Sequence, residues 1–201
     1  MLERIREISG VVLNADEYLD DFWPNFRKID DVFWKLERIQ SFRGAAEPSW
    51  VAIAEGDWDR SLKLIDDKRP GLREHERRTD RFARRRIRIV EQPVTPYLHW
   101  EMHVLALQVA AGEQVRVLDA QAVADLEVGR RLPELVVLGT SMMYEVTYDS
   151  SGAHSGARRI DDPEVIAACR GELDKMFAVG EDCLAYYERE IVPLSAPQVT
   201  I

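Results

Sequence analysis

Between Thr95 and Ala111, apolar residues recur with the period of an α-helix, and a carboxylate lies among them. Advancing each residue by about 100° gives two adjacent apolar flanks: Leu98, Met102, Leu105 and Val109 on one, and Trp100, Val104 and Leu107 on the other. Tyr97, Glu101 and Gln108 fall between these flanks, so Glu101 is expected on the buried face. The remaining face, which carries His99, His103, Ala106 and Ala110, is expected to be solvated or loosely covered. The helix is further indicated by Thr95 as N-cap, Pro96 at the first helical position and Gly112 after the last turn.

Short segments on both sides of this helix follow the period of a β-strand. Residues 86–90 alternate charged and β-branched side chains, which predicts a strand with one buried face, and residues 115–118 predict a second strand. Strand, helix and strand at this spacing indicate a βαβ unit with parallel strands. Further strands are expected at 135–138, 142–148 and 156–160, with a hairpin turn at 149–152. Asp162 and Pro163 begin a last helix that runs toward Glu190, with Gly180 bending or splitting it.

The N-terminal half is rich in aromatic residues and has a less regular pattern. We interpret residues 16–42 as mainly helical, with Pro24 at a helix start or kink rather than at an interior position. Counting helically from Phe33 places Leu36, Glu37, Gln40 and Arg43 on the same face. This polar stripe has two interpretations: it reaches solvent at the rim of the core, or it faces Glu101 across a pocket. The aromatic residues are expected to form a lid or a docking surface.

The pattern as a whole predicts an α/β protein with a mixed sheet, a βαβ unit, a helical N-terminal subdomain and a long C-terminal helix. We expect a single domain over residues 1–201. Within it, residues 1–82 form a mainly helical subdomain, residues 83–192 an α/β sheet subdomain, and residues 193–201 an extended tail.

Glu101 is the main candidate for a functional residue, because burying an unpaired charge costs several kcal/mol. Its carboxyl group should therefore be protonated, paired with a cation, or open to a cleft. The cations best placed beside it are Arg86 and Arg88 on the preceding strand and Arg116 on the following one. In the alternative interpretation, a buried ion pair with an arginine simply orients two elements.

Composition narrows the class of protein. The 201 residues are 46% hydrophobic and carry a net charge of -9, which fits a folded domain and opposes direct binding to nucleic acid. The dense arginine run at 77–88 is interleaved with acids, so a solvated surface is favoured over an anion site. Neither a signal peptide nor a membrane span is indicated. Cys169 and Cys183 are expected to be free thiols in a reducing compartment, and the predicted location is cytoplasmic.

No cofactor or metal is predicted. His99 and His103 are four residues apart on a helix, as zinc ligands can be, but a third ligand has no evident source and Glu101 points to the opposite side. Glycine patterns for phosphate or dinucleotide binding are absent from the sequence, as is a nucleophile elbow. The acidic neighbours of Cys183 should raise the pKa of its thiol, which disfavours covalent catalysis.

Several segments together resemble an uncharacterised actinobacterial family of small acidic proteins: Phe33–Arg43, Arg86–Glu101, Ala111–Leu118 and Asp161–Pro163. Members are often encoded near helix-turn-helix regulators or within specialised-metabolite clusters. The resemblance implies family positions at Arg88, Pro93, Tyr97, Glu101, Gly112, Glu113 and Arg116. Residues 135–144 depart from the commonest family pattern. The C-terminal half is also similar to half of a phospholipase D-type domain, but it lacks the H-x-K-x4-D motif, so that activity is not carried over.

These observations favour a cytoplasmic protein with a pocket for a polar small molecule, in specialised metabolism. The candidate chemistry is metal-free acid/base catalysis or elimination, by an enzyme or its subunit. Glu101 is the candidate catalytic carboxylate, and the candidate ligand-binding residues are Tyr97, Glu37, Gln40, Arg43, Arg88 and Arg116. The alternative is a non-enzymatic accessory protein that contacts a helix-turn-helix regulator, or a second copy of itself, through the N-terminal aromatic helices. A plain structural role for the buried ion pairs is the third possibility.

Overall fold

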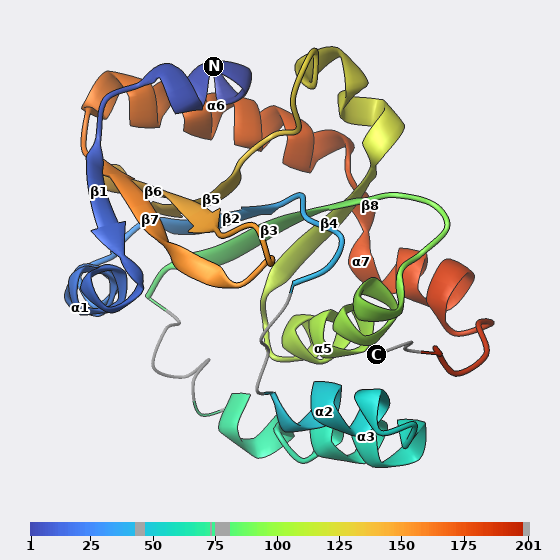
Figure 1. Ribbon diagram of the computed structural model, residues 1–201. Coiled ribbons are helices and arrows are strands. Elements are labelled where there is room, and N and C mark those ends of the chain that lie inside the picture. The colour runs from blue at the N-terminus through green and yellow to red at the C-terminus, as the bar shows by residue number, and fades with distance from the viewer. Residues whose placement is uncertain (43–46, 73, 75–80, 199–201) are drawn as a thin grey trace.

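One eight-stranded mixed sheet forms the centre of the computed structural model, which describes residues 1–42, 47–72, 74 and 81–198 (Figure 1). The strands are β1 (Val11–Asn14), β2 (Val32–Glu37), β3 (Ala83–Val90), β4 (Gln114–Asp119), β5 (Glu134–Leu138), β6 (Met142–Tyr148), β7 (His154–Ile160) and β8 (Glu181–Asp182). They are ordered β1-β7-β6-β5-β2-β3-β4-β8. The α-helices are α1 (Ala15–Phe26), α2 (Pro48–Ala54), α3 (Trp58–Asp66), α5 (Pro96–Ala110), α6 (Pro163–Val179) and α7 (Cys183–Tyr186). Shorter helical segments are η1 (Leu2–Glu7), η2 (Ala120–Leu126) and η3 (Tyr187–Ile191). The predicted fold class is confirmed.

The predicted βαβ unit is β3, α5 and β4. The two strands are parallel, with Arg86 opposite Val115 and Arg88 opposite Val117. Helix α5 begins as the sequence indicates, because the hydroxyl of Thr95 accepts a hydrogen bond from the N–H of Leu98 at 3.1 Å. Strand β2 is parallel to β3 but antiparallel to β5. The sheet therefore changes from parallel to antiparallel pairing at β2.

The helical interpretation of residues 33–42 is wrong, because residues 32–37 form strand β2. Its side chains alternate between the two faces of the sheet, as strand geometry requires. Phe33 packs in the cluster beneath α1, whereas Trp34 and Leu36 belong to the cluster beneath α6. Pro24 also differs from expectation, since it lies inside α1, in its last turn.

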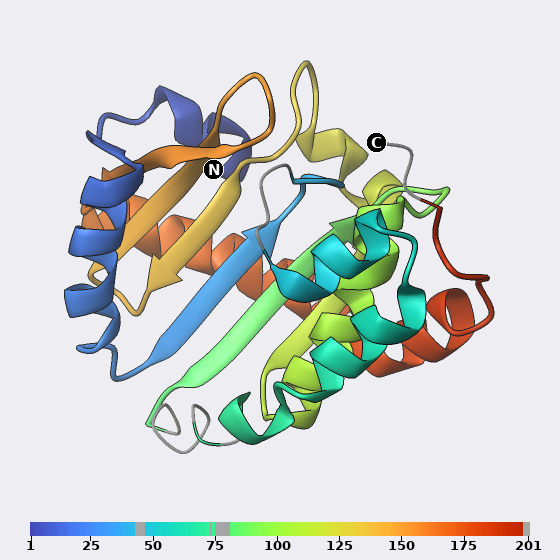
Figure 2. The ribbon, with the colours of Figure 1, turned by 60° about the horizontal axis from the view of Figure 1, so that its bottom comes forward.

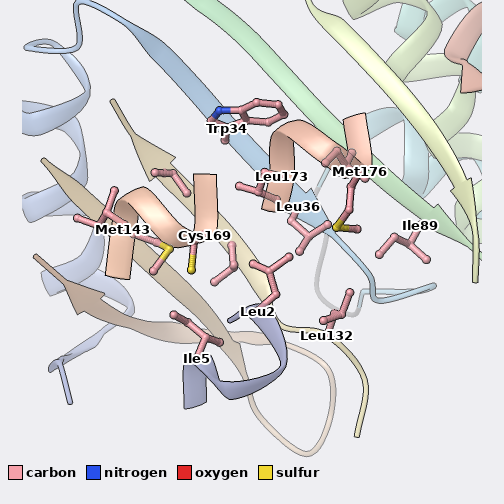
Figure 3. Close-up of a cluster of buried hydrophobic side chains, with 14 of the residues drawn as sticks. Leu2, Ile5, Trp34, Leu36, Ile89, Leu132, Met143, Cys169, Leu173 and Met176 are labelled. Carbon is pink, nitrogen blue, oxygen red and sulfur yellow. The ribbon is translucent and has the colours of Figure 1, made fainter. Parts of the chain in front are cut away.

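The main apolar core lies between the sheet and the segments η1 and α6 (Figure 3). Leu2 and Ile5 from η1 pack there with Cys169, Leu173 and Met176 from α6. Asp162 caps α6 as predicted, accepting hydrogen bonds from the N–H groups of residues 164 and 165. The predicted helix toward Glu190 is split at Gly180, one of the two outcomes expected there, after which the chain adds β8 to the edge of the sheet.

On the opposite face of the sheet, α1 covers one half of the strands and α5 covers the other half (Figures 1 and 2). Helix α1 packs over β5, β6 and β7, with Phe22 and Phe26 in the shared core, and α5 packs over β4. Helices α2 and α3 contact α5 from outside. The expectation that the N-terminal aromatic residues form a docking surface is therefore corrected: Phe22, Phe26 and Phe33 are buried, although Trp23 is 47% exposed.

Within the part of the chain that the structure describes, no helix has the length and apolar character that a bilayer span requires.

Candidate ligand-binding cleft

A cavity of about 560 Å³ opens between α5 and the β6–β7 hairpin, above β2 and β3. Helix α5 contributes one wall through Tyr97, Trp100, Glu101, Val104, Leu105 and Gln108. The stripe of Tyr97, Glu101 and Gln108 that the helical pattern predicts therefore faces this cavity. The floor consists of Lys35 and Glu37 from β2 and Arg86 from β3, and the rest of the lining is Phe42, Tyr148, Ala153 and His154.

Glu101 is both paired with a cation and open to the cavity. Its Oε2 accepts a hydrogen bond from Nε of Arg88 at 2.8 Å, and its side chain is 10% exposed. Burial raises the pKa of Glu101 above its usual value, and the positive charge of Arg88 only partly offsets this effect. A carboxyl group with a raised pKa keeps its proton to a higher pH than one in water, which suits it to acid/base chemistry.

Arg88 is fully buried and holds the backbone as well as Glu101. Its Nη1 donates to the carbonyl oxygens of Glu37 at 3.2 Å and Ile89 at 3.1 Å, and its Nη2 donates to that of Ile39 at 2.7 Å. One side chain therefore connects the end of β2, the end of β3 and α5. Of the three arginines predicted beside Glu101, Arg88 is the direct partner.

Arg86 links two carboxylates at the floor of the cavity. Its Nη1 donates to both oxygens of Glu37, at 2.7 and 2.8 Å, and its Nε donates to Glu113 at 2.7 Å. Lys35 contacts Glu37 as well, with Nζ 2.9 Å from Oε1. Burial alone would raise the pKa of Glu37, but Arg86, Lys35 and Arg88 together hold it well below its usual value. Glu37 therefore stays ionised, whereas Glu101 does not strongly favour ionisation.

The charged face of β3 is buried, which corrects the prediction of a strand with one buried face. Arg84, Arg86 and Arg88 are 9%, 8% and 0% exposed. Carboxylates from other elements neutralise Arg86 and Arg88, whereas Arg84 donates to the carbonyl of Ala111 at 2.7 Å. A buried row of arginines on a central strand is stable only with such partners. The sequence pattern alone does not reveal them.

Glu134 belongs to the same region and was not predicted. A second cavity of about 220 Å³ shares Lys35, Glu37, Tyr148 and His154 with the first and adds Glu134 to its lining. The Oε1 atom of Glu134 accepts hydrogen bonds from the N–H groups of Arg38 at 2.5 Å and Ile39 at 2.6 Å. Burial, and secondarily the negative charge of Glu37, raises the pKa of Glu134 to about 7. Its only sequence signal is an acidic residue at the start of an apolar strand.

Aromatic rings form the rim of the larger cavity. The ring of Phe42 lies 5.3 Å from that of Tyr97 and 4.9 Å from that of Tyr148, and Tyr97 lies 5.2 Å from Trp100, between ring centroids. The indole N–H of Trp100 donates to the hydroxyl of Ser49 at 2.9 Å. Burial, followed by the charges of Glu101 and Glu37, raises the pKa of Tyr97, so its hydroxyl stays protonated and can donate a hydrogen bond.

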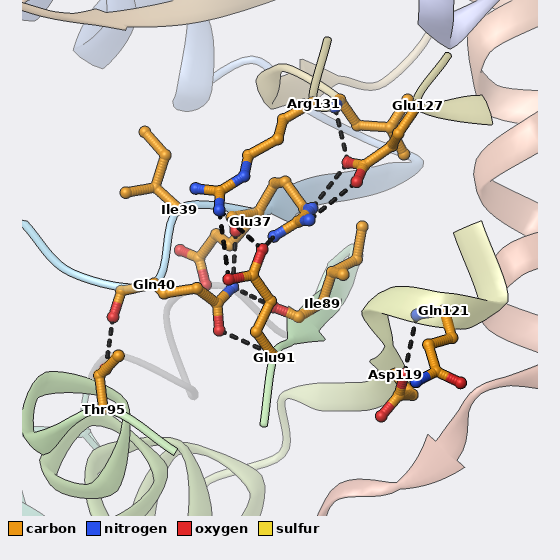
Figure 4. Close-up of polar contacts among 12 residues, drawn as sticks. Glu37, Ile39, Gln40, Ile89, Glu91, Thr95, Asp119, Gln121, Glu127 and Arg131 are labelled. Atoms are coloured by element: carbon orange, nitrogen blue, oxygen red, sulfur yellow. Dashed lines mark hydrogen bonds and ion pairs between the residues drawn. The ribbon is translucent and has the colours of Figure 1, made fainter. Parts of the chain in front are cut away.

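Gln40 holds the backbone instead of lining the cavity (Figure 4). Its amide nitrogen donates to the carbonyls of Arg38 at 2.6 Å and Ile89 at 2.8 Å, and its side-chain oxygen accepts from the N–H of Glu91 at 2.8 Å. Its own carbonyl accepts from the hydroxyl of Thr95 at 2.6 Å. Gln40 therefore joins the segment after β2 to the end of β3 and the start of α5.

Two further predicted site residues are not placed in the cavity. Arg116 is on the opposite face of the sheet, where it lies over the ring of Phe177 and pairs with Asp182 at 3.4 Å. The prediction that it flanks Glu101 is wrong, because side chains on a strand alternate and only Val115 and Val117 of β4 pack against α5. Arg43 lies outside the described residues.

Of the two expectations for the histidine face of α5, the structure supports a covered face, although Ala110 is exposed. Trp58 of α3 packs against both imidazoles, 5.0 Å from His99 and 5.0 Å from His103 between ring centroids. The hydroxyl of Tyr187 lies 2.8 Å from Nδ1 of His103, and burial lowers the pKa of His103 to about 4. Over the described ranges, no three His, Cys, Asp or Glu side chains converge as metal ligands.

Both cysteines are free thiols, as predicted, and both are buried. Burial raises the pKa of Cys183 to about 12, with a smaller contribution from the negative charge of Asp182. The sequence indicates only the acidic neighbours as a cause of the raised pKa, whereas burial is the larger cause in the structure.

Comparison with known proteins assigns a family but not an activity. A family model described as "Domain of unknown function (DUF6879)" matches residues 20–188. No curated protein matches the chain. Among solved structures, the chain is similar to TrmBL2, described as an archaeal chromatin protein with a novel mode of DNA binding, at 10% identity and a TM-score of 0.42. The match covers 88% of this chain and 55% of that one.

This comparison corrects the exclusion of nucleic acid. Net charge predicted no direct contact with nucleic acid, whereas the matched structure is that of a DNA-binding protein. Net charge is a sum over the whole chain, but binding depends on a local surface. A negative net charge therefore does not exclude binding to nucleic acid. DNA binding is not assigned to this chain, because a similarity with a TM-score of 0.42 carries no functional argument.

Proposed function

The chain belongs to the DUF6879 family, whose function is unknown, and from the geometry of the cleft we propose that it binds a polar small molecule beside Glu101. Metal-free acid/base chemistry at the Glu101 carboxyl is the reaction that this site would support. The proposal includes a reducing compartment such as the cytoplasm, because Cys169 and Cys183 are free thiols.

The observation that carries the proposal is the state of Glu101. Burial raises its pKa although Arg88 donates a hydrogen bond to it, and the carboxyl group still lines a cavity. Strongly perturbed carboxyl groups in cavities are candidates for function. A cavity volume of about 560 Å³ lies within the range of small-molecule sites, which is roughly 300 to 1,000 Å³.

The roles of the neighbouring residues follow from their contacts. Glu37 stays ionised and can accept hydrogen bonds from a ligand, and Tyr97 can donate one. Phe42 and Trp100 supply apolar surface at the rim. Arg88 acts through Glu101 and the backbone, so it is a positioning residue rather than a ligand contact.

A thermal-shift screen of polar metabolites tests the proposal with a matched pair of variants. Glu145 is the control, because it is buried with the same exposed fraction as Glu101, 7%, and is also paired with an arginine, Arg158. Ligands of the cleft should raise the unfolding midpoint of the wild type and of Glu145→Gln, and should have less effect on Glu101→Gln. Compounds that stabilise all three proteins equally would contradict the site assignment.

The chemical part of the proposal has a separate test. A compound that binds should exchange an acidic C–H with deuterium when incubated with the protein in D₂O, as followed by mass spectrometry. The exchange should disappear in Glu101→Gln and persist in Glu145→Gln. If the wild type binds the compound but does not exchange the C–H, the acid/base role is refuted and only the binding function remains.

A further inference from the structure

An apolar groove lies beside α1 and joins the cleft at its floor. It has a volume of about 370 Å³ and shares Lys35, Arg86 and Gln108 with the larger cavity. We call it the α1 groove. The two spaces are neighbours, because these three side chains line both.

Aromatic rings line the α1 groove on the side of α1. Phe22 and Phe26 are stacked with centroids 5.4 Å apart, and Phe33 on β2 lies 5.2 Å from Phe26. Two apolar side chains of the lining also face water: Leu19 is 45% exposed and Trp23 is 47% exposed. Rings held against one another in this way fit a planar apolar group.

The charges of the α1 groove differ from those of the chain as a whole. Three cationic side chains, Lys35, Arg84 and Arg86, line it together with a single carboxylate, Glu113. The chain carries a net charge of -9. Glu37 does not line the groove but pairs with Lys35 and Arg86, and with it the cluster still has three cations and two carboxylates. This small excess of positive charge beside apolar rings is complementary to an anion with an apolar body.

Lys35 is the cation best placed to reach a ligand. It lines the α1 groove, the larger cavity and the cavity of Glu134. Its ammonium group has three donors, one of which points to Glu37 at 2.9 Å, and its side chain is 31% exposed. Arg84 and Arg86 are more deeply buried and already donate to Ala111 and to the two carboxylates.

We propose that the α1 groove binds an organic anion with a planar apolar body, whose acidic group pairs with Lys35. The inference rests on the proposed function in treating the cleft as a ligand site, and it adds a chemical class for the part of the ligand that lies along α1.

Anilinonaphthalene sulfonate is a suitable probe, because it joins a sulfonate to fused aromatic rings and becomes fluorescent in apolar surroundings. The wild type should bind it saturably at one site. Lys35→Gln should weaken binding about tenfold, through loss of a charge-assisted hydrogen bond, and Lys35→Arg should restore it. Leu19→Gln and Trp23→Ala should each weaken binding about threefold or more, through loss of apolar contact.

Two matched controls remove the same groups outside the groove. Lys68 is also paired with a glutamate, Glu47, and Leu184 is 38% exposed on α7. Lys68→Gln and Leu184→Gln should bind the dye as the wild type does. Because the dye also binds loosened folds, each variant must keep its near-UV circular dichroism. If Lys35→Gln loses its near-UV circular dichroism, the variants of the half-exposed Leu19 and Trp23 decide whether the dye binds in the α1 groove.

The inference is overturned if the dye does not bind saturably, or if its affinity is unchanged in Leu19→Gln and Trp23→Ala. Glu101→Gln separates this result from the proposed function, because Glu101 does not line the α1 groove. If Glu101→Gln binds both the dye and the metabolites as the wild type does, the proposed function alone is contradicted. Metabolite binding that depends on Glu101, with dye binding insensitive to the groove variants, would contradict the groove alone.

Discussion

The buried pair of Glu101 and Arg88 has two unequal members. Arg88 donates to Glu101 and to the carbonyls of Glu37, Ile39 and Ile89, so its charge is solvated entirely by the protein. Glu101 contacts one of these donors and also faces a cavity. The arginine is therefore needed for the fold, whereas the charge of the glutamate is not.

Replacement of Glu101 should separate the hydrogen bond from the charge. In Glu101→Gln the amide oxygen can still accept from Arg88, and Glu37 and Glu134 still act on the arginine's charge. We expect a free energy of unfolding within about 1 kcal/mol of the wild type at neutral pH. Glu101→Leu removes the acceptor and should cost about 3 kcal/mol or more. Urea unfolding measures both values, and equal losses would contradict this account.

Glu134 should make stability depend on pH. Its pKa of about 7 in the folded state exceeds its usual 4.5, so the folded protein holds this proton more tightly than the unfolded chain does. The resulting stabilisation is complete below pH 4.5 and is lost as the pH rises to about 7.

In Glu134→Gln this dependence should disappear, because the amide has no proton to lose and its oxygen can still accept from Arg38 and Ile39. As the pH rises across this range, the free energy of unfolding of the variant should increase by about 3 kcal/mol relative to that of the wild type. Urea unfolding of both proteins as a function of pH provides the test, and parallel curves would count against the raised pKa.

At the residue scale, local periodicity predicts the position of Glu101 but not the burial of Arg86 and Arg88. An alternation of charged and apolar residues looks the same whether its polar face meets water or meets carboxylates of other elements. The partners that decide the matter, Glu37 and Glu113, are 49 and 27 residues from Arg86 in sequence. No local pattern includes them.

At the scale of elements, the segment after β2 is held by Gln40. The sequence predicts this side chain as a ligand contact, but within the described residues its hydrogen bonds go to the backbone of residues 38, 89 and 91. It secures the junction between β2, β3 and the start of α5.

Gln40→Ala should therefore act on stability. Loss of three hydrogen bonds to the backbone, two buried and one partly buried, should lower the free energy of unfolding by about 3 kcal/mol. Gln92 is a matched control, because in the described part of the chain its side-chain amide makes one long hydrogen bond, 3.2 Å to Tyr186. Gln92→Ala should cost about 1 kcal/mol or less. A stable Gln40→Ala with weakened ligand binding would restore the original prediction.

The elements differ in how far the sequence specifies them. Helix α5 carries its own N-cap and a helical period over 15 residues, so it is predicted nearly to the residue. Strand β2 has 6 residues, too few for a period of two to stand out among aromatic residues that also suit a helix. Its identity is decided by pairing with β3 and β5, which lie far along the chain.

At the scale of the whole molecule, the cleft exists because α1 and α5 pack over different sides of one sheet face. The sequence predicts the βαβ unit, the hairpin and the mixed sheet. It does not predict the order of the strands or the distance between α1 and α5, because both depend on contacts between remote segments. The candidate site could therefore be predicted residue by residue on α5. On β2 the sequence indicates Glu37, although through a helical count that the structure contradicts, and it indicates neither Lys35 of β2 nor Glu134 of β5.

The same arrangement should produce uneven protection of backbone amides. Strand β3 is paired on both sides and packed against α6 on one face and beneath α5 on the other, whereas β1 is an edge strand of 4 residues with Val12 79% exposed. In hydrogen exchange followed by mass spectrometry, amides of β3 should exchange slowest and those of β1 fastest. Equal protection of the two strands would show that the sheet opens only as a unit.

The position of Arg88 has a consequence for genetics. A screen for variants that lose activity in cells would recover substitutions of this residue readily, since they would deplete the protein itself. Such alleles would map to the heart of the cleft and would resemble active-site mutations, although the arginine acts on folding. Informative alleles would be those at Glu101, Tyr97 or Lys35 that leave protein abundance unchanged, so the amount of folded protein should be measured for every allele before a phenotype is attributed to chemistry.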